Sequence, residues 1–302
     1  MIHIINPFIG DEQHNNIQEI TFESIKRAKL YEANSDVETV FAYYKEDEEV
    51  IPNWAIRRQE LKKSIRDFFP NNPKKLPLLY ELFEEVKNDE SIDYVIYSNI
   101  DIALHYQFYS TIKEFIEQGF DAFAINRRRV SESYKSTNDL NQLYSEVGEI
   151  HPGYDCFVVK RKLLSKFVFG NACIGIPFID SVMLFNLIAF GNNFKLFTDK
   201  HLTFHIGYEL VKNWGSKELV THNKQEYLKS LNQVKSNILL KNIPGSGLPF
   251  FKRHFKWLMN PTISYPIVAK IDFKQWGNER YIQDSEKMKG YYEWLQKRVN
   301  LD

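Results

Sequence analysis

The chain has 302 residues, enough for one large α/β domain or for one such domain with a helical appendage, but not for two unrelated full domains. Hydrophobic residues make up 43% and charged residues 26%, which is typical of a chain that folds and excludes wholesale disorder. Lys plus Arg and Asp plus Glu both number 39, so no global field favours a polyanion and we expect no nucleic-acid partner.

Short apolar runs alternate with helical patterns along the first two thirds of the chain. We expect strands at His3–Phe8, Val37–Tyr44, Tyr94–Tyr97, 121–126, 155–160, 193–198 and 202–206, and helices at 20–33, 75–88, 107–119 and 181–191. The run Tyr94–Tyr97 is apolar throughout, as in a strand buried on both faces of a parallel sheet. The alternation predicts a doubly wound α/β fold with a Rossmann-like, mostly parallel central sheet flanked by helices.

Two stretches depart from this alternation. Residues 127–145 form a polar excursion between strands, and from about Tyr208 the pattern changes to charged helical segments around IPGSGLPFF. We therefore predict an α/β domain at 1–208 and a mainly helical C-terminal extension at 209–302. Residues 248–260 alternate aromatic with basic side chains, which favours either peripheral contact with an anionic membrane or packing against the first domain.

The location of the protein is predicted from its thiols and its apolar runs. Cys156 and Cys173 are few thiols for this length, which favours a reducing compartment, with a single disulfide as the alternative. The opening MIHIINPFIGDE has no basic leader, and no stretch approaches the roughly 18 uncharged apolar residues of a spanning helix. We expect a cytoplasmic protein, with peripheral membrane contact as a variant of that expectation.

Polar residues directly after a buried strand are the first candidates for a site, because ligands of open α/β sheets bind beyond the carboxyl ends of the strands. Asn99 and Asp101 lie there. A carboxylate in this place can bind a hard divalent cation that neutralises a diphosphate, and Asn99 can add a carbonyl ligand or a ribose contact. The alternative is that both residues cap a helix beginning near His105.

Three further positions combine an imidazole or a carboxylate with a suitable place in the pattern. His151 and Asp155 lie on one predicted turn, which favours acceptor binding, or a turn in which Asp155 binds backbone N–H groups. Asp180 opens an apolar helix, as a cap or as a general base toward a sugar hydroxyl. His205 follows an apolar run, as a metal ligand or as a core histidine.

Basic residues provide candidates for a diphosphate. Arg127 heads a run of three arginines after a predicted strand, and its planar donors suit phosphate, although charge runs also face solvent. Arg66 and Lys75 are weaker candidates of the same kind. The sequence has no Gly-rich phosphate loop, no cysteine pair with zinc spacing and no Gly-x-Ser-x-Gly elbow, so the enzyme classes that use them lose support.

The order of these pieces across roughly residues 1–208 resembles glycosyltransferases of the GT-A type. In that family a strand ends in an Asp-x-Asp motif, and SNIDIAL is similar to a variant in which Asn99 replaces the first acid. The segments HPGYDCFVVKRKLLSKF, GIPFIDSVMLFNLIAFGNNF and LTFHIGY resemble, in order, the family's acceptor-recognising segment, its acid at a helix start and its late metal-binding histidine. The opening INPFIGDE departs from the commoner Pro-x-Tyr-Asn form.

The resemblance implies an enzyme that moves a sugar, with inversion, from a nucleoside diphosphate sugar to a hydroxyl of a saccharide or glycoconjugate acceptor, as in surface polysaccharide synthesis. It implies Asp101 and His205 as ligands of Mn²⁺ or Mg²⁺, Asp180 as catalytic base and Asp155, with His151, as acceptor contacts. Donor contacts are expected from Asn6, Pro7, Arg66, Asn99, Asp101 and Arg127. The alternatives are a degenerate domain that binds a glycan or nucleotide without turnover, and a nucleotidyltransferase that releases pyrophosphate.

Overall fold

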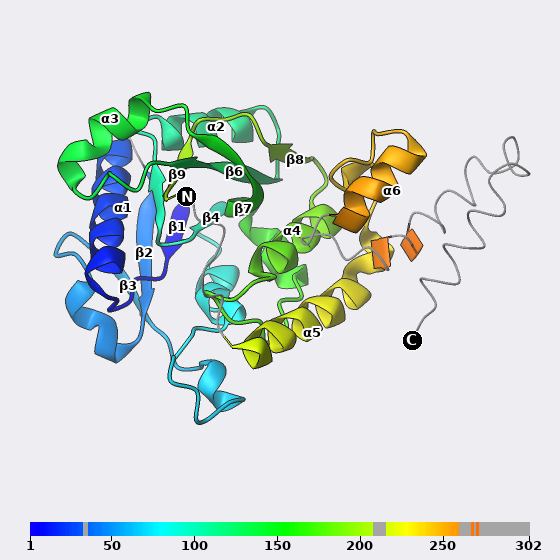
Figure 1. Cartoon of the computed structure of the whole chain (residues 1–302), viewed down its shortest axis with the longest axis horizontal. Helices are drawn as coiled ribbons and strands as arrows, with labels where there is room; N and C mark the ends of the chain where they lie inside the picture. Colours follow the sequence, from blue (N-terminus) through cyan, green and yellow to red (C-terminus); the bar gives the residue numbers. More distant parts are fainter. Residues whose placement is uncertain (33–35, 208–215, 260–266, 269, 272–302) are drawn as a thin grey trace, which may run out of the picture.

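The computed structural model describes residues 1–32, 36–207, 216–259, 267–268 and 270–271, and these form a sheet covered by helices on both faces (Figure 1). The strands are β1 (Ile2–Ile5), β2 (Glu38–Tyr43), β3 (Arg57–Glu60), β4 (Tyr94–Ser98), β5 (Ile102–Leu104), β6 (Ala122–Val130), β7 (Glu149–Lys160), β8 (Phe194–Phe197) and β9 (Thr203–Ile206). The helices are α1 (Glu12–Tyr31), α2 (Phe108–Glu117), α3 (Leu140–Ser145), α4 (Ile179–Phe190), α5 (Lys217–Val234) and α6 (Phe250–Met259).

Within the described residues the sheet has nine strands, in the order β3-β2-β1-β4-β7-β6-β9-β5 with β8 beside β6. Five of the strand pairs are parallel, namely β1–β2, β2–β3, β1–β4, β6–β8 and β6–β9. The pairs β4–β7, β6–β7 and β5–β9 are antiparallel. The predicted α/β fold with a mostly parallel central sheet flanked by helices is therefore confirmed.

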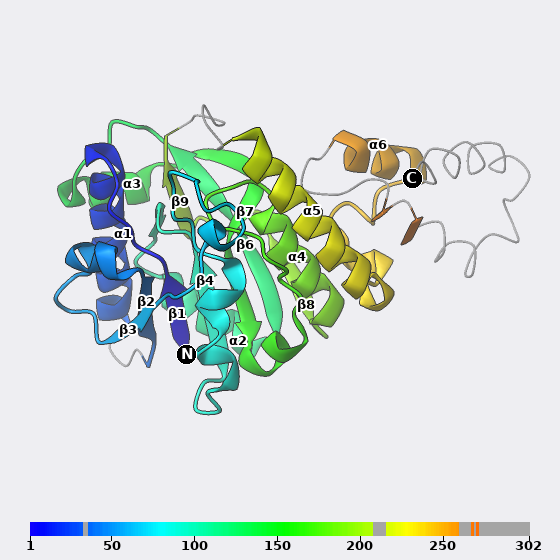
Figure 2. The ribbon, with the colours of Figure 1, turned by 90° about the horizontal axis from the view of Figure 1, so that it is seen from below.

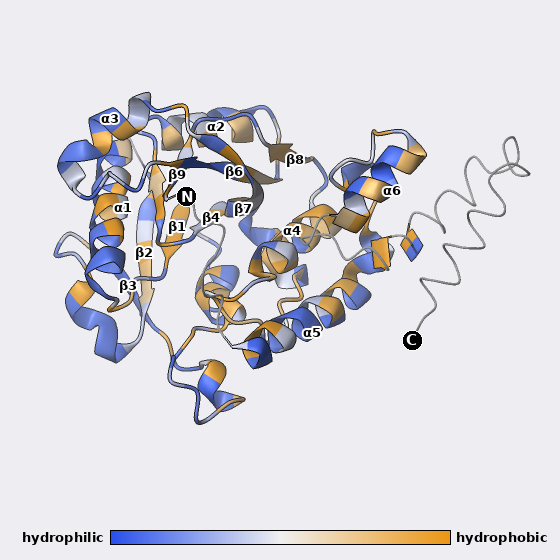
Figure 3. Cartoon of the chain, in the orientation of Figure 1, coloured by the Kyte–Doolittle hydropathy of each residue, from blue (hydrophilic) through white to orange (hydrophobic). Residues whose placement is uncertain are grey.

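Two apolar clusters pack on opposite faces of the sheet. One joins alternate residues of the central strands to α4 and α5, and the other joins the intervening strand residues to α1 and α2. Nine of the 12 residues of α4 are buried, because this helix lies between the sheet and α5 (Figure 2). Figure 3 shows the central strands mainly hydrophobic, whereas α1 and α5 carry hydrophilic residues over much of their surface. Strand β4 is fully buried, as its composition predicts.

Three expectations about local structure are wrong. Residues 75–88 do not form one amphipathic helix but two short 3-10 helices, because bridges from Pro77 to Ser64 and from Leu78 to Cys173 hold the start of the segment extended. The polar excursion at 127–145 begins inside β6 and contains α3. The predicted turn at 151–155 is part of β7, which pairs with β6 through register shifts.

The C-terminal helices share the main core as far as they are described. Tyr227, Leu231 and Val234 of α5 belong to the same apolar cluster as α4 and the strands. The predicted domain boundary near 208, and residues 260–266, 269 and 272–302 of the predicted extension, lie outside the described residues. Within the described part, no helix is long and apolar enough to cross a membrane. Both cysteines are free and buried, which rules out the disulfide alternative.

Candidate functional site

The carboxyl ends of four co-directed strands bring the candidate residues together. β1 and β4 are parallel, β6 and β9 are parallel, and β7 lies antiparallel to both β4 and β6, so all four strands point the same way. Asn6 and Asp101 follow β1 and β4, whereas Arg127 and His205 lie in the C-terminal parts of β6 and β9. The sheet therefore concentrates polar side chains at one edge, as α/β sheets with ligand sites do.

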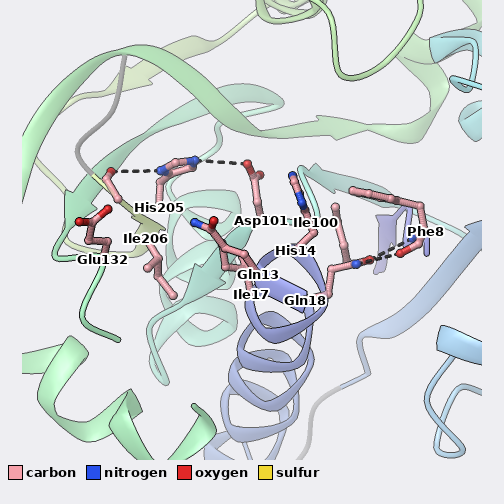
Figure 4. Close-up of a pocket in the computed structure, with 11 residues that line it drawn as sticks. Phe8, Gln13, His14, Ile17, Gln18, Ile100, Asp101, Glu132, His205 and Ile206 are labelled. Atoms are coloured by element: carbon pink, nitrogen blue, oxygen red, sulfur yellow. Dashed lines mark hydrogen bonds and ion pairs between the residues drawn. The ribbon is translucent and has the colours of Figure 1, made fainter. Parts of the chain in front are cut away.

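Asp101 and His205 form an ion pair at this edge. The Oδ2 atom of Asp101 lies 3.3 Å from Nε2 of His205, and the side chains are 42% and 22% exposed (Figure 4). Burial alone raises the pKa of Asp101, but the hydrogen bond and charge of His205, with the charge of Arg127, outweigh burial and lower it to about 2. Burial lowers the pKa of His205, but its bond to Asp101 outweighs burial and raises it. His205 is therefore not a core histidine.

Asn99 links the strand end of β4 to Asp155 of β7. Its Nδ2 donates to Oδ1 of Asp155 at 2.8 Å, and its Oδ1 accepts from the hydroxyl of Tyr97 at 3.1 Å. An aspartate at position 99 would lack the donor and would place a second carboxylate against Asp155. The helix-cap alternative is wrong, because β5 follows this turn and Gln107 occupies the N-cap position of α2.

Arg127 lies between Asp155 and His151. Its Nη1 lies 2.7 Å from Oδ2 of Asp155, and its Nη2 lies 3.1 Å from Nε2 of His151. Burial raises the pKa of Asp155, opposed by Arg127 and reinforced by Asp101. Burial, then the charges of Arg127 and Arg129, lower the pKa of His151 to about 3, so the imidazole is neutral. The expectation that Asp155 binds backbone N–H groups in a turn is wrong.

Asp180 lies in the first turn of α4, where the sequence places it, and faces the same cluster. Burial and, second, the negative charge of Asp155 raise its pKa to about 6, although the backbone N–H of Ser181 donates to its Oδ1 at 2.8 Å. A methyl group built on Gly153 would lie 3.7 Å from Oδ2 of Asp180 and 3.0 Å from Cε1 of His151. Glycine at 153 therefore leaves room for the His151 imidazole, whereas the distance to Asp180 is an ordinary van der Waals contact.

A cavity of about 370 Å³ opens beside the Asp101–His205 pair. Figure 4 shows side chains of the start of α1 facing this pair across the cavity. Its lining consists of Phe8, Gln13, His14, Ile17, Gln18, Ile100, Asp101, Glu132, His205, Ile206 and Gly207. The residues from α1 and Glu132 were not expected from the sequence. The Asp11 cap, which accepts from the backbone N–H of His14 at 2.9 Å, was the available signal that α1 begins near the strand ends.

Three of the expected donor contacts have other partners or surroundings. Asn6 is 8% exposed and its Nδ2 donates to the carbonyl of Ala42 at 2.6 Å. Pro7 is buried and precedes Phe8 of the cavity lining. The guanidinium of Arg66 donates to the carbonyls of Asn72 and Pro73, so it is engaged within its own loop.

The side chains at the strand ends supply only part of the ligands that a divalent cation needs. No group of three or more His, Cys, Asp or Glu side chains that could hold a metal ion is found within the described ranges. Neighbouring ligands of an octahedral Mg²⁺ lie about 3 Å apart, because each lies about 2.1 Å from the metal. The 3.3 Å between Asp101 and His205 fits two such neighbours. The residues therefore fit an ion that takes its other ligands from a bound diphosphate and water.

Comparison with known proteins gives structural similarity without sequence similarity. No family model matches the chain, and no curated protein matches its sequence. Similar solved structures include residues 1–349 of S. aureus TarS in complex with UDP-GlcNAc, at 10% identity and a TM-score of 0.49 over 99% of this chain and 80% of that fragment. The galactosyltransferase LgtC, in complex with donor and acceptor sugar analogues, is similar at 9% identity and a TM-score of 0.37 over 78% of this chain and 96% of LgtC.

A third similar structure is that of a synthase. The 4-diphosphocytidyl-2C-methyl-D-erythritol synthase from Anaerococcus prevotii has 14% identity and a TM-score of 0.36 over 76% of this chain and 96% of its own. All three TM-scores lie below 0.5. These similarities therefore carry no argument about function.

Proposed function

We propose that the protein is a glycosyltransferase that moves a sugar from a nucleoside diphosphate sugar to an acceptor hydroxyl, with inversion. One observation carries the proposal: a single arginine, Arg127, acts on the pKa of three carboxylates, Asp101, Asp155 and Asp180, whose pKa values lie on both sides of the usual range. Active sites separate the pKa values of neighbouring carboxylates in this way, so that one carboxylate binds a metal or a charge and another transfers a proton.

The donor would bind at the cavity beside Asp101. Its volume of about 370 Å³ lies in the range of small-ligand sites, and one wall is the start of α1. Asp101 and His205 would hold a Mn²⁺ or Mg²⁺ ion, which when bound neutralises the diphosphate leaving group. Because a histidine ligand must be neutral, metal binding would release a proton from His205.

Asp180 would act as the base. With a pKa of about 6 its carboxylate is largely ionised at neutral pH and basic enough to take a proton from a hydroxyl. The acceptor oxygen then forms a bond to the anomeric carbon as the bond from that carbon to the diphosphate breaks, and the hydroxyl proton moves to Asp180. The neutral His151 and the Asp155 carboxylate, next to Asp180, would contact the acceptor.

The first experiment is a thermal-shift series with UDP, GDP, CDP and dTDP, with and without Mn²⁺, on the wild type and Asp101→Ala. A ligand at a hundredfold excess over its dissociation constant stabilises the native state by about 2.7 kcal/mol. We expect one nucleotide to give a metal-dependent shift that the variant abolishes. Absence of any shift would remove the donor site, and release of pyrophosphate instead of nucleoside diphosphate would indicate a nucleotidyltransferase.

A second candidate function, a binding domain without turnover, follows from Asn99. The resemblance leads one to expect an acid there, but this amide is bonded to Asp155 and Tyr97, which leaves Asp101 as the one carboxylate of the motif. Such a domain would give the thermal shift with no release of nucleoside diphosphate in the presence of acceptor. Product release stimulated by Mn²⁺ would exclude it.

We also propose that α6 lies on an anionic membrane surface. Its inner side is fixed by the indole N–H of Trp257, which donates to the carbonyl of Pro244 at 2.7 Å. Its outer side carries two exposed lysines, Lys252 and Lys256, and the helix has no acidic residue. The exposed apolar side chains of this helix are Phe251, Phe255, Leu258 and Met259, at 54% to 68% exposure. An apolar stripe flanked by lysines suits the boundary of anionic lipid headgroups.

Flotation with vesicles of phosphatidylglycerol and phosphatidylcholine tests this contact. We expect binding that phosphatidylcholine alone does not support and that Phe255→Glu abolishes. Ile56→Glu, at a side chain 89% exposed elsewhere on the surface, is the matched control and should bind as the wild type does. Equal binding by both variants, or no binding by the wild type, would refute the proposed membrane contact. Asn260, the last residue of the predicted contact, lies outside the described residues.

A further inference from the structure

A buried asparagine of α5 closes the loop that leads into α4. Asn223 is fully buried, and its Oδ1 accepts from the backbone N–H of Cys173 at 3.0 Å. Its Nδ2 lies within donating distance of three carbonyls, those of Cys173 at 2.9 Å, Ile176 at 3.2 Å and Pro177 at 3.1 Å. One side-chain amide thus fixes both ends of the loop 173–177.

The residue after this loop has a strained backbone. Phe178 has a φ of 81° and is the one non-glycine residue with positive φ among the residues that the structure describes. It is the N-cap of α4, and Asp180 follows two residues later. Its ring stacks on Tyr227 of α5, with centroids 5.8 Å apart and 18° between the planes. A bulky residue keeps such a conformation only where its surroundings fix it, and such strain clusters at functional sites.

The contacts of α5 with the preceding segment extend along one face of the helix. His222 pairs with the carbonyl of Asn171 at 2.9 Å, and Glu226 accepts from the backbone N–H of Asn171 at 2.9 Å. Together with Asn223 and Tyr227 these residues recur with helical spacing, four apart in each pair. One face of α5 therefore contacts the entry into α4 from residue 171 to residue 178, whose first part is also bonded to residues 77–79.

We propose that α5 positions Asp180, with Asn223 and Tyr227 as the positioning residues that act through the loop 173–177 and the strained Phe178. The inference rests on the proposed function, in which Asp180 is the base. The half-buried carboxylate of Asp180 stays beside Asp155 because α5 fixes where α4 begins. Without these contacts the first turn of α4 can rotate, and Asp180 then moves away from Asp155 toward solvent. A misplacement of about 1 Å can cost about a hundredfold in rate.

The test compares Asn223→Asp with Ser230→Ala. The aspartate keeps the shape of Asn223 but presents no N–H group to the three carbonyls, so the hydrogen bonds that hold both ends of the loop are lost. Ser230 is also a buried residue of α5, but its hydroxyl donates to the carbonyl of Val168, outside the loop. Ser230→Ala therefore controls for the loss of a buried hydrogen bond made by α5. We expect Asn223→Asp to lower kcat by about tenfold to a hundredfold with the donor KM within about twofold.

A second readout does not depend on turnover. Burial and the charge of Asp155 raise the pKa of Asp180, whereas the hydrogen bond from Ser181 and the charge of Arg127 lower it. The charge of Asp180 in turn raises the pKa of Tyr154. We expect the Asp180 carboxyl, followed by carbon NMR, to titrate near its ordinary range in Asn223→Asp and to be unchanged in Ser230→Ala. Phe178→Gly, which relieves the φ strain but removes the ring that stacks on Tyr227, should reproduce the loss of kcat.

The outcomes separate the two proposals. If Asn223→Asp and Phe178→Gly keep the kcat of Ser230→Ala and leave the Asp180 titration unchanged, the positioning role is wrong. If Asp180→Asn retains turnover within a few-fold of the wild type, or the wild type transfers no sugar, the base assignment is wrong. In that case the NMR titration still decides whether α5 positions the carboxyl.

Discussion

The replacement of Asp180 by asparagine should make the protein more stable while it removes the proposed base. The pKa of Asp180 is raised from 3.8 to about 6, because burial and the charge of Asp155 disfavour the ionised form. A carboxyl that binds its proton more tightly in the folded state loses stability as pH rises from its unfolded pKa through its folded pKa. Above about pH 6 the wild type therefore carries the full cost of the ionised, buried group.

The magnitude follows from the two pKa values. At about 1.4 kcal/mol per pKa unit, the difference between 3.8 and about 6 corresponds to about 3 kcal/mol. Asparagine keeps an oxygen that accepts from the N–H of Ser181, so the local bond is retained. We expect Asp180→Asn to be more stable than the wild type by up to about 3 kcal/mol at pH 8, with the gain shrinking below pH 6 and absent below pH 4.

Urea unfolding between pH 3.5 and pH 8 measures this gain. Asp139→Asn is a control of opposite sign, because the backbone N–H groups of Lys135 and Ser136 lower the pKa of Asp139. Its stabilising effect is present above its ordinary pKa and lost as pH falls, so the variant should be less stable at pH 7 and equal at low pH. A gain for Asp180→Asn that is the same at every pH, or a loss at pH 8, would refute the reasoning.

Three further predictions concern the cluster around Arg127. Asn99→Asp places a second carboxylate against Asp155 and removes a bond of 2.8 Å, so it should cost about 2 kcal/mol in urea unfolding at pH 7 and less at pH 4; an equal cost at both pH values would contradict the charge argument. Gly153→Ala puts a methyl group 3.0 Å from His151, so kcat should fall while nucleotide thermal shifts are unchanged; unchanged kcat would show that the imidazole moves freely. Arg127→Met removes a charge that lowers the pKa of His151, so that pKa should rise in an NMR titration, and a constant value would show that the charge of Arg127 does not contribute.

Much of the fold could be predicted from local patterns. The apolar runs and helical spacings identify β1, β2, β4, α2, α4 and β9 within a few residues, because these elements bury a regular set of side chains. The helix predicted at 75–88 fails because its periodicity is overridden by distant partners such as Cys173. The arginines of β6 were interpreted as a loop, because a strand that extends into a site carries polar residues that resemble a loop.

The site could be predicted in part. Asp101, Asp180 and His205 occupy the strand and helix ends that their positions in the pattern indicate. Their roles stay predictions. The hydrogen bond from the Asn99 amide to Asp155 could not be foreseen, because it joins residues 56 apart whose proximity depends on the register of β4 against β7. The lining from α1 was missed because the helix begins at Glu12, well before the apolar spacing that identified it.

The bond between Asn99 and Asp155 has a consequence for how sequences of this kind can vary. The two side chains share one hydrogen bond, so exchanging them, as Asn99→Asp with Asp155→Asn, preserves the bond with donor and acceptor reversed. The exchange is not neutral, because Arg127 lies 2.7 Å from Asp155 and would then face an uncharged amide. The arginine therefore fixes on which strand the charge lies. Relatives that carry an acid at position 99 should accordingly lack both the acid at 155 and the arginine at 127, so the three positions are expected to vary as one unit.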